Sequence, residues 1–264
     1  MKIDLKGKTA LVTGSTSGIG NAIARGFAAA GAHVVVNGRT QAKVDAAVAA
    51  LAKVASGPNV RGVAADVSTA AGCKALVAAL PDADILVNNA GIFEPKGFLD
   101  IPDEDWSRFF EVNVMSGVRL SRAYLPGMFK RNWGRIVFIS SESALNIPKE
   151  MIHYGMTKTA QLAVSRGLAE MTRGTAVTVN SVLPGPTMSE GVEGFVKELA
   201  KQNGQSVEEA ASQFVKQFRP TSLLERFATV EEIANMVIYV ASKESSATNG
   251  AALRAEGGTI NSIA

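Results

Sequence analysis

The sequence has few of the residues that build covalent or metal-held frameworks. Its 264 residues include one cysteine, Cys73, and two histidines, His33 and His153. A single cysteine excludes an internal disulfide and a thiolate metal cluster. Two histidines so far apart in the sequence do not form a metal site without help from carboxylates. We therefore expect neither a disulfide nor a bound metal, as in a protein of a reducing compartment.

Long apolar runs are also missing. No stretch approaches the roughly 18 consecutive apolar residues that cross a bilayer. Residues 1–8 mix charged and apolar side chains and do not resemble a secretory signal. We expect a cytoplasmic protein with no membrane partner.

Charge of one sign is not concentrated anywhere along the chain. Lysine and arginine number 27 and aspartate and glutamate 24, which gives a formal net charge of +3. The basic residues are scattered among acidic ones, whereas a nucleic-acid surface needs a basic cluster. We expect no nucleic-acid partner and a small molecule as the substrate.

Short β-branched runs alternate with alanine-rich segments of helical period. The expected strands are residues 9–13, 33–37, 60–65, 84–88, 135–140, 176–183 and about 251–255; the expected helices are 19–30, 41–54, 71–80, 103–132, 153–172 and 230–242. Continuously apolar strands are typical of a parallel sheet that helices cover on both faces. No linker or repeat divides the chain. The pattern predicts an α/β fold, a doubly wound parallel sheet of the Rossmann type with about seven strands, in a single domain over residues 1–264.

Residues 186–229 interrupt this alternation with two amphipathic stretches. The second begins at Ser206, with Glu209 three residues later, which predicts a capping box. An insertion after the carboxyl end of a strand overhangs the edge where doubly wound sheets bind their ligands. We interpret the insertion as a substrate lid. A surface excursion without a role is the alternative.

A glycine turn, Thr13-Gly14-Ser15-Thr16-Ser17-Gly18-Ile19-Gly20, joins the first expected strand to the first helix. Glycine permits close backbone approach, and the amides of a helix N-terminus attract negative charge. The turn predicts a site for a dinucleotide diphosphate, although tight turns also use glycine for steric reasons alone. The expected contacts are Gly14, Ser15, Ser17, Gly18, Ile19 and Gly20.

This glycine spacing and the motifs that follow it resemble the short-chain dehydrogenase/reductase family. The ordered set covers about residues 5–258: Asp66-Val67, Asn88-Asn89-Ala90-Gly91, Asn113, Ser141, Tyr154-x-x-x-Lys158 and Pro184-Gly185-Pro186-Thr187. The resemblance implies a nicotinamide cofactor and a homo-oligomer, commonly a tetramer. The cofactor contacts that it implies beyond the glycine turn are Asp66, Val67, Asn89, Ala90, Gly91, Tyr154, Lys158, Pro184, Gly185 and Thr187.

The end of the second expected strand bears on the choice between NAD(H) and NADP(H). An acidic residue there would bind the ribose hydroxyls and repel a 2′-phosphate. This chain has Asn37-Gly38-Arg39 instead, and a guanidinium binds phosphate through two hydrogen bonds. We expect NADP(H) to be favoured, with Arg39 as the phosphate contact. An Arg39 that only begins the next helix in solvent is the alternative.

Tyr154 and Lys158 are four residues apart, on one face of a helix. An ammonium stabilises a nearby phenolate and lowers the phenol pKa from about 10, so that the tyrosine can exchange a proton. The resemblance implies that Ser141 binds the substrate oxygen and that Asn113 supports a water-linked proton path to Lys158. The expected function is an NADP(H)-dependent oxidoreductase that transfers a hydride between nicotinamide and a carbonyl or secondary alcohol, with Asn113, Ser141, Tyr154 and Lys158 as the catalytic set.

Two other functions stay open at this point. One is a 3-oxoacyl-thioester (acyl-carrier-protein) reductase, which ranks lower because residues 92–96 lack the Thr-Arg-Asp segment usual in those enzymes. The other is a non-catalytic dinucleotide-binding or redox-sensing module, which would not need the four catalytic residues together. The expected substrate pocket is partly apolar and includes Phe93, Glu142, Ile147, Met151, Met188 and Phe195.

Overall fold

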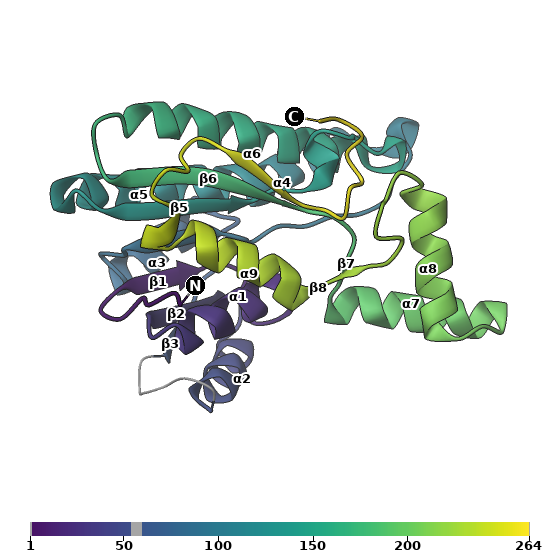
Figure 1. Cartoon of the computed structure of the whole chain (residues 1–264), viewed down its shortest axis with the longest axis horizontal. Coiled ribbons are helices and arrows are strands. Elements are labelled where there is room, and N and C mark those ends of the chain that lie inside the picture. The colour runs from purple at the N-terminus through teal and green to yellow at the C-terminus, as the bar shows by residue number, and fades with distance from the viewer. Residues whose placement is uncertain (1, 54–59, 264) are drawn as a thin grey trace.

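A seven-stranded parallel sheet forms the centre of the structure, a computed structural model (Figure 1) that describes residues 2–53 and 60–263, apart from the side chain of Phe195. Its strands are β1 (Thr9–Val12), β2 (His33–Gly38), β3 (Val60–Ala64), β4 (Ile85–Asn88), β5 (Gly134–Ile139), β6 (Val177–Pro184) and β9 (Ala252–Ala255). They lie in the order β3-β2-β1-β4-β5-β6-β9, and every neighbouring pair is parallel. The doubly wound sheet expected from the sequence is confirmed.

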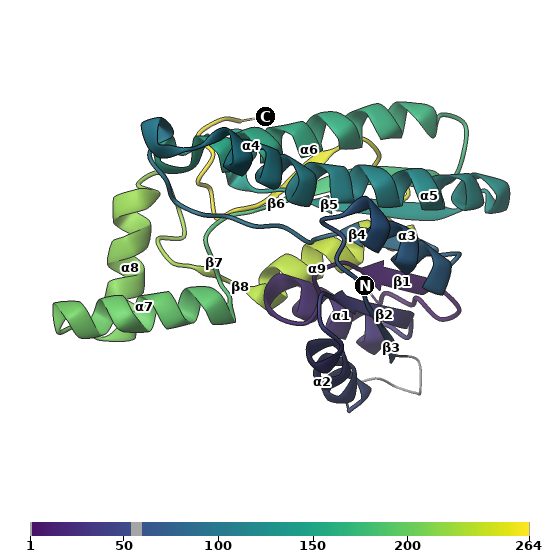
Figure 2. The same ribbon diagram turned by 180° about the vertical axis from the view of Figure 1, so that it is seen from behind.

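Helices cover both faces of the sheet, as Figures 1 and 2 show from opposite sides. One core joins the sheet to α1 (Gly18–Ala29), α2 (Gln41–Ala52) and α9 (Val230–Val240); the other joins it to α3 (Ala70–Ala79), α5 (Ser116–Arg131) and α6 (Ile152–Met171). Along β1, Val12 faces the first core and Leu11 the second. Both faces of each inner strand are therefore buried, which explains the continuous apolar runs in the sequence.

The winding of the chain reverses between β1 and β4. From β1 the sheet grows through β2 and β3 on one side, whereas β4 lies on the other side and pairs with β1, with Val12 beside Val87. The carboxyl ends of β1 and β4 are consequently neighbours. Doubly wound folds bind their ligands at such a switch point.

The single helix expected over residues 103–132 is interrupted. A helix, α4 (Asp103–Phe110), continues into a π-helical turn at Glu111–Met115 and only then into α5. Asn113 is the middle residue of that turn. A π-helical turn inserts an extra residue into the helical register and is common at functional sites.

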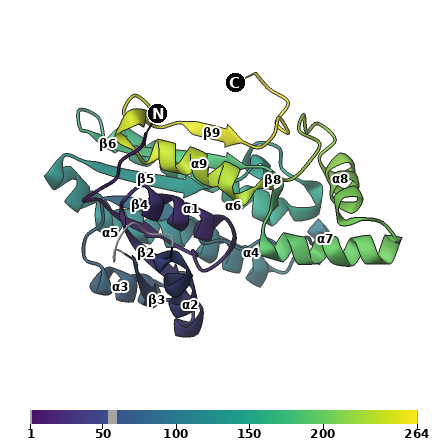
Figure 3. The same ribbon diagram turned by 60° about the horizontal axis from the view of Figure 1, so that its bottom comes forward.

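The insertion between β6 and α9 forms a separate helix pair. Strand β7 (Thr187–Met188) pairs with β8 (Ala228–Thr229), and α7 (Glu190–Asn203) and α8 (Val207–Phe218) lie between them in sequence. The predicted capping box is confirmed, since Glu209 N donates to Ser206 Oγ at 3.1 Å and Ser206 N donates to Glu209 Oε2 at 2.9 Å. Figure 3 shows the pair standing beyond the end of the sheet. The buried side chains of its own small core are Val196, Ala200, Ala210, Val215 and Phe227.

Within residues 2–53 and 60–263, no helix combines the length and apolar character needed to cross a membrane. The same part of the chain brings no three histidine, cysteine or acidic side chains together in a way that would hold a metal ion.

Candidate active site

The glycine turn after β1 lies directly against the loop after β4. Gly14 has a φ of 61°, and a Cβ atom there would lie 3.0 Å from the Cα atom of Ala90. A Cβ atom at Gly20 would lie 2.4 Å from Asn89 Nδ2. Any larger residue at these two positions would push the loops apart. Glycine is therefore required here by close approach and, at Gly14, by backbone conformation.

Two asparagines fix the shape of this turn. Asn89 Nδ2 donates to the carbonyl oxygens of Thr13 and Gly14 at 2.8 and 3.1 Å. Asn37 Nδ2 donates to Val63 O at 3.1 Å, and its Oδ1 accepts from Gly14 N at 3.4 Å. The side-chain amide of Asn37 thus holds the glycine turn in place. From the sequence, Asn37 was noted only because it is not an acidic residue.

The N-terminus of α1 is prepared for an anion. Its N-cap residue, Ser17, makes no side-chain capping hydrogen bond, and its first turn contains no acidic residue. By contrast, α8 and α9 begin with complete capping boxes and acidic first turns. The first amides of a helix need an external partner when no side chain caps them. Together with the glycine turn, these free amides at the start of α1 fit the diphosphate of a dinucleotide.

The other expected cofactor contacts lie around the same edge of the sheet. Arg39 is exposed and directly follows β2, next to Gly38, whose Cβ position would lie 2.5 Å from Thr16 of the glycine turn. Asp66 is exposed and accepts a hydrogen bond from Ser68 N at 3.0 Å, while Val67 is buried.

Gly91 and the segment after β6 lie nearer the catalytic candidates. A Cβ atom at Gly91 would lie 3.3 Å from Asn113 Oδ1 and 3.5 Å from Lys158 Nζ. Pro184 ends β6, and Thr187 Oγ1 donates to Gly185 O at 2.9 Å. The expected cofactor and catalytic residues therefore share one edge of the sheet.

Tyr154 and Lys158 lie one turn apart near the start of α6. Lys158 is 5 % exposed, its Nζ donates to Ile139 O at 2.9 Å, and it lies 5.5 Å from the centroid of the Tyr154 ring. Ser141 follows β5, accepts from Ser143 N at 3.1 Å, and its hydroxyl is near enough to Tyr154 to favour the ionised phenol. The structure thus brings the three side chains together.

Burial biases both titratable groups toward their neutral forms. It raises the pKa of Tyr154 to about 12, and the nearby Ser141 hydroxyl acts in the opposite direction. It also lowers the pKa of Lys158 to about 7. A proton on Lys158 is therefore loosely held near neutral pH, next to a phenol that needs a positive charge before it can ionise.

Asn113 connects the loop after β4 to α6. Its Oδ1 accepts from Ile92 N at 2.8 Å, and its Nδ2 donates to Ile92 O and to Thr157 Oγ1, both at 3.0 Å. Gln161 Nε2 donates to Asn113 O at 2.6 Å, and Thr157 Oγ1 donates to Tyr154 O at 2.7 Å. Sequence reasoning missed Thr157 and Gln161. The available signal was their spacing, because positions 154, 157, 158 and 161 share one helical face.

A second residue that the sequence did not indicate is Arg219, at the end of α8. Its Nε donates to Glu142 Oε1 at 2.6 Å and its Nη1 to Glu150 Oε1 at 3.3 Å. Glu142, expected in the pocket, is buried directly after Ser141. No local pattern links residue 219 to residue 142, so only the fold reveals this ion pair.

The remaining residues expected in the substrate pocket differ in exposure. The ring of Phe93 packs edge-on against that of Tyr154, with 6.4 Å between the ring centroids. Ile147 is exposed, and Met151 and Met188 are half-buried. The side chain of Phe195 lies outside the described part of the structure.

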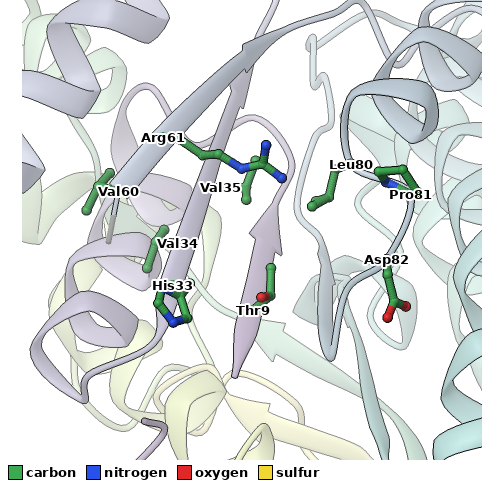
Figure 4. Close-up of a pocket in the computed structure, with 9 residues that line it drawn as sticks. All are labelled: Thr9, His33, Val34, Val35, Val60, Arg61, Leu80, Pro81 and Asp82. Carbon is green, nitrogen blue, oxygen red and sulfur yellow. The ribbon is translucent and has the colours of Figure 1, made fainter. Parts of the chain in front are cut away.

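A cavity of about 470 Å³ lies at the amino-terminal ends of strands β1, β2 and β3 and is separate from this site. Figure 4 shows it between the first residues of β1, β2 and β3 and the chain that follows α3. Its lining residues are Thr9, His33, Val34, Val35, Val60, Arg61, Leu80, Pro81 and Asp82. The glycine turn and the catalytic candidates all follow the opposite, carboxyl ends of the strands.

Comparison with known proteins identifies relatives over the whole chain. A family model described as short chain dehydrogenase matches residues 8–203. The chain is 51% identical to the uncharacterized oxidoreductase YvaG of Bacillus subtilis (strain 168), over 100% of both chains. It is 35% identical to a D-beta-hydroxybutyrate dehydrogenase of Cupriavidus necator, over 97% of this chain and 99% of that one. The structure of L-sorbose reductase from Gluconobacter frateurii, complexed with NADPH and L-sorbose, superposes with a TM-score of 0.93 at 33% identity and covers 100% of both chains.

Proposed function

The chain belongs to the short-chain dehydrogenase family, and from that premise we propose that it uses Tyr154 to transfer a proton while a carbonyl is reduced, or a secondary alcohol oxidised, with NADP(H). Oxidoreductase activity on alcohol or carbonyl groups with a nicotinamide cofactor follows from family membership. The proposal adds the roles of individual residues and the choice of cofactor.

The observation that carries the proposal is the position of Tyr154 between the buried Lys158, 5.5 Å from its ring centroid, and the Ser141 hydroxyl. Ser141 binds the carbonyl oxygen and directs it toward the Tyr154 hydroxyl, which donates its proton to that oxygen. The nearby Lys158 ammonium stabilises the phenolate that is left. The dinucleotide supplies the hydride chemistry when it is bound. Asn113 holds the loop that contains Gly91 against α6. It thereby fixes the distance between that loop, which would contact the cofactor, and Tyr154 on α6.

The preference for NADP(H) is inferred from Arg39 and from the hydrogen bonds that Asn37 makes within the protein. The Asn37 amide is engaged by the glycine turn and by β3, so this position presents no carboxylate to the adenine ribose. Arg39 follows one residue after β2 ends and is free to turn toward a 2′-phosphate, since it is exposed. The charge of a guanidinium favours the phosphorylated cofactor.

The helix pair α7–α8 acts as a lid in this proposal. It follows β7, just beyond the strand end at Pro184, and its far end contacts Glu142 through Arg219. Because the pair has a small core of its own, it can move as a unit about the β7–β8 strands. Closure of such a lid would exclude water from Tyr154.

We also propose that the chain forms a homo-oligomer through α5 and α6. The outer faces of these helices form an apolar groove that includes Leu125, Pro126, Phe129, Val164 and Leu168. At its end Met171 is 61% exposed. Apolar surface of this kind is typical of subunit contacts. Sedimentation equilibrium tests the proposal, and a monomer at micromolar concentration would contradict it.

The proposed function is tested by NADPH oxidation with a panel of ketones, diketones, quinones, hydroxylated ketones and a 3-oxoacyl thioester. We expect reduction of at least one carbonyl compound, with a higher kcat/KM for NADPH than for NADH. Binding of NADPH without turnover of any panel member would favour the non-catalytic module. Preference for the 3-oxoacyl thioester over every other compound would favour the acyl-carrier-protein reductase.

A further inference from the structure

A buried carboxylate lies immediately beside the proposed proton donor. Glu142 follows Ser141 in sequence and is 3% exposed. One of its oxygens, Oε1, accepts from Arg219. The other, Oε2, is buried and accepts no hydrogen bond of normal geometry from the described residues, while the Ser143 hydroxyl is near enough to favour the ionised carboxylate. An unsatisfied buried acceptor is costly, so its persistence suggests a partner that comes from outside the chain.

The guanidinium that pairs with Glu142 also pairs with a second carboxylate. Arg219, whose side chain is 12% exposed, is paired with Glu142 at 2.6 Å and with Glu150 at 3.3 Å. A third carboxylate, that of Glu256, is close enough to raise the pKa of Glu142, and it lies 3.8 Å from Arg254. Around Arg219 and Arg254, three carboxylates therefore accompany two guanidinium groups.

Glu142 and Arg219 lie near enough to the reaction site to influence it. The charge of Glu142 raises the pKa of Tyr154, and the charge of Arg219 lowers it. Burial raises the pKa of Glu142 itself, while the ion pair with Arg219 and the nearby Ser143 hydroxyl favour its ionised form. A substrate oxygen held by Ser141 thus has the Glu142 carboxylate as its neighbour.

We propose that Glu142, backed by Arg219, binds a hydroxyl group of an uncharged polyhydroxylated substrate, so that the enzyme acts on neutral hydroxyketones and the corresponding polyols. This inference rests on the proposed function and names its substrate class. A hydroxyl near the reacting carbon donates to Glu142 Oε2, while Arg219 keeps Oε1 and holds α8 over the substrate. Because Arg219 belongs to the lid, binding of the substrate and closure of the lid involve the same ion pair.

Two other substrate classes fit the site less well. A substrate carboxylate would approach a buried glutamate whose counter-charge is already shared with Glu150, and like charges in a water-poor site repel strongly. A hydrocarbon ketone would leave Glu142 Oε2 without a partner after water is excluded. Sites built to bind a substrate hydroxyl reject analogues that lack it.

The test compares matched substrates on the wild-type enzyme with NADPH. The hydroxylated probes are the ketohexoses D-fructose, L-sorbose, D-tagatose and D-psicose. Each is paired with the ketouronate that has a carboxylate in place of its terminal CH₂OH group, and 2-hexanone serves as the probe without hydroxyls. We expect the highest kcat/KM for a ketohexose, a value about 10-fold or more lower for its ketouronate, and one about 100-fold or more lower for 2-hexanone.

A binding measurement accompanies the kinetics. Saturation-transfer NMR on the NADPH complex of Tyr154→Phe should detect the preferred ketohexose and not its ketouronate at equal concentration. A ketouronate or 2-hexanone that matches or exceeds every ketohexose in kcat/KM overturns the inference. If 2-hexanone or a diketone is reduced and no ketohexose is reduced or bound, the inference fails and the proposed function stands. If no carbonyl compound is reduced, the proposed function fails, and the NMR result alone decides the subsite.

A pair of variants tests the residue itself. Glu142→Gln removes the charge with little change of shape, and we expect the preference for ketohexose over ketouronate to fall about 10-fold, mainly through KM. The control is Glu231→Gln, which breaks an exposed ion pair with Arg25 at 2.8 Å on the surface of α1 and α9. The control should keep the wild-type preference. An unchanged preference in Glu142→Gln contradicts the role of this carboxylate, and if that variant does not fold, the wild-type series and the NMR measurement still decide.

Discussion

Removal of the buried ammonium of Lys158 should make the protein without cofactor more stable near neutral pH. Burial lowers the pKa of this group from 10.5 to about 7. At about 1.4 kcal/mol per pH unit, this difference means that the folded protein loses about 5 kcal/mol by holding the charged form. Lys158→Met removes that cost but leaves Ile139 O without its donor, which costs about 1–3 kcal/mol. We expect a net gain of about 2–4 kcal/mol in the free energy of unfolding at pH 7.

The pH dependence gives the sharper signature of the same effect. Between pH 7 and pH 10 the unfolded chain keeps a proton on Lys158 that the folded chain has lost. Wild-type stability therefore rises with pH by about 1.4 kcal/mol per unit relative to the variant. The advantage of Lys158→Met should be constant below pH 7, shrink as the pH rises above 7, and reverse before pH 10.

Urea denaturation of both proteins without cofactor, from pH 6 to pH 10, measures this difference. Lys74→Met, the same substitution at an exposed position on α3, controls for the loss of one positive charge. A stability difference for Lys158→Met that does not change with pH, or that grows with pH, would contradict the lowered pKa of Lys158 in the folded protein.

Three further variants test other parts of the site. Arg39→Ala should weaken NADPH binding roughly 10- to 100-fold, because a charge-assisted contact is lost, and NADH binding only slightly; fluorescence titration measures both, and equal losses would remove the phosphate contact. Gly20→Ala should weaken NADPH binding and cost about 1–3 kcal/mol in urea denaturation, since its Cβ would lie 2.4 Å from Asn89 Nδ2. Gly194→Ala, where nothing lies within 4 Å, is the matched control and should stabilise α7 slightly. Thr157→Val should lower kcat about 10-fold with unchanged NADPH affinity, because Asn113 loses a hydrogen bond; a change in affinity alone would contradict a positioning role.

The fold was predictable because each of its features is a local pattern in the sequence. Continuously apolar strands such as the one that begins at His33, with helices of period 3.6 between them, specify a parallel sheet covered on both faces. The capping box at Ser206 was equally local, since it involves residues three positions apart. The main local error was the helix over 103–132. A π-helical turn at Asn113 leaves no compositional mark, because it depends on packing against the loop after β4 and against α6.

The candidate site was predictable to the extent that its residues lie in ordered motifs. Tyr154 and Lys158 share a helical face by spacing alone, and Ser141 follows a strand end. Arg219 could not be found in this way, because it lies 77 residues from Glu142 in sequence and contacts it only through the tertiary fold. The hydrogen bonds of Asn37 were likewise not predictable. Its amide binds the glycine turn through contacts that no sequence spacing encodes.

We propose that Tyr154 transfers the proton at a site that binds NADP(H). Single-turnover oxidation of NADPH by Tyr154→Phe, with the best carbonyl substrate of the wild-type enzyme and with NADPH affinity measured in parallel, tests this role of the tyrosine. We predict a rate lower by roughly 100- to 10,000-fold, with an NADPH dissociation constant within about threefold of the wild-type value, a change of less than about 1 kcal/mol. A Tyr154→Phe rate close to that of the wild type would contradict the account.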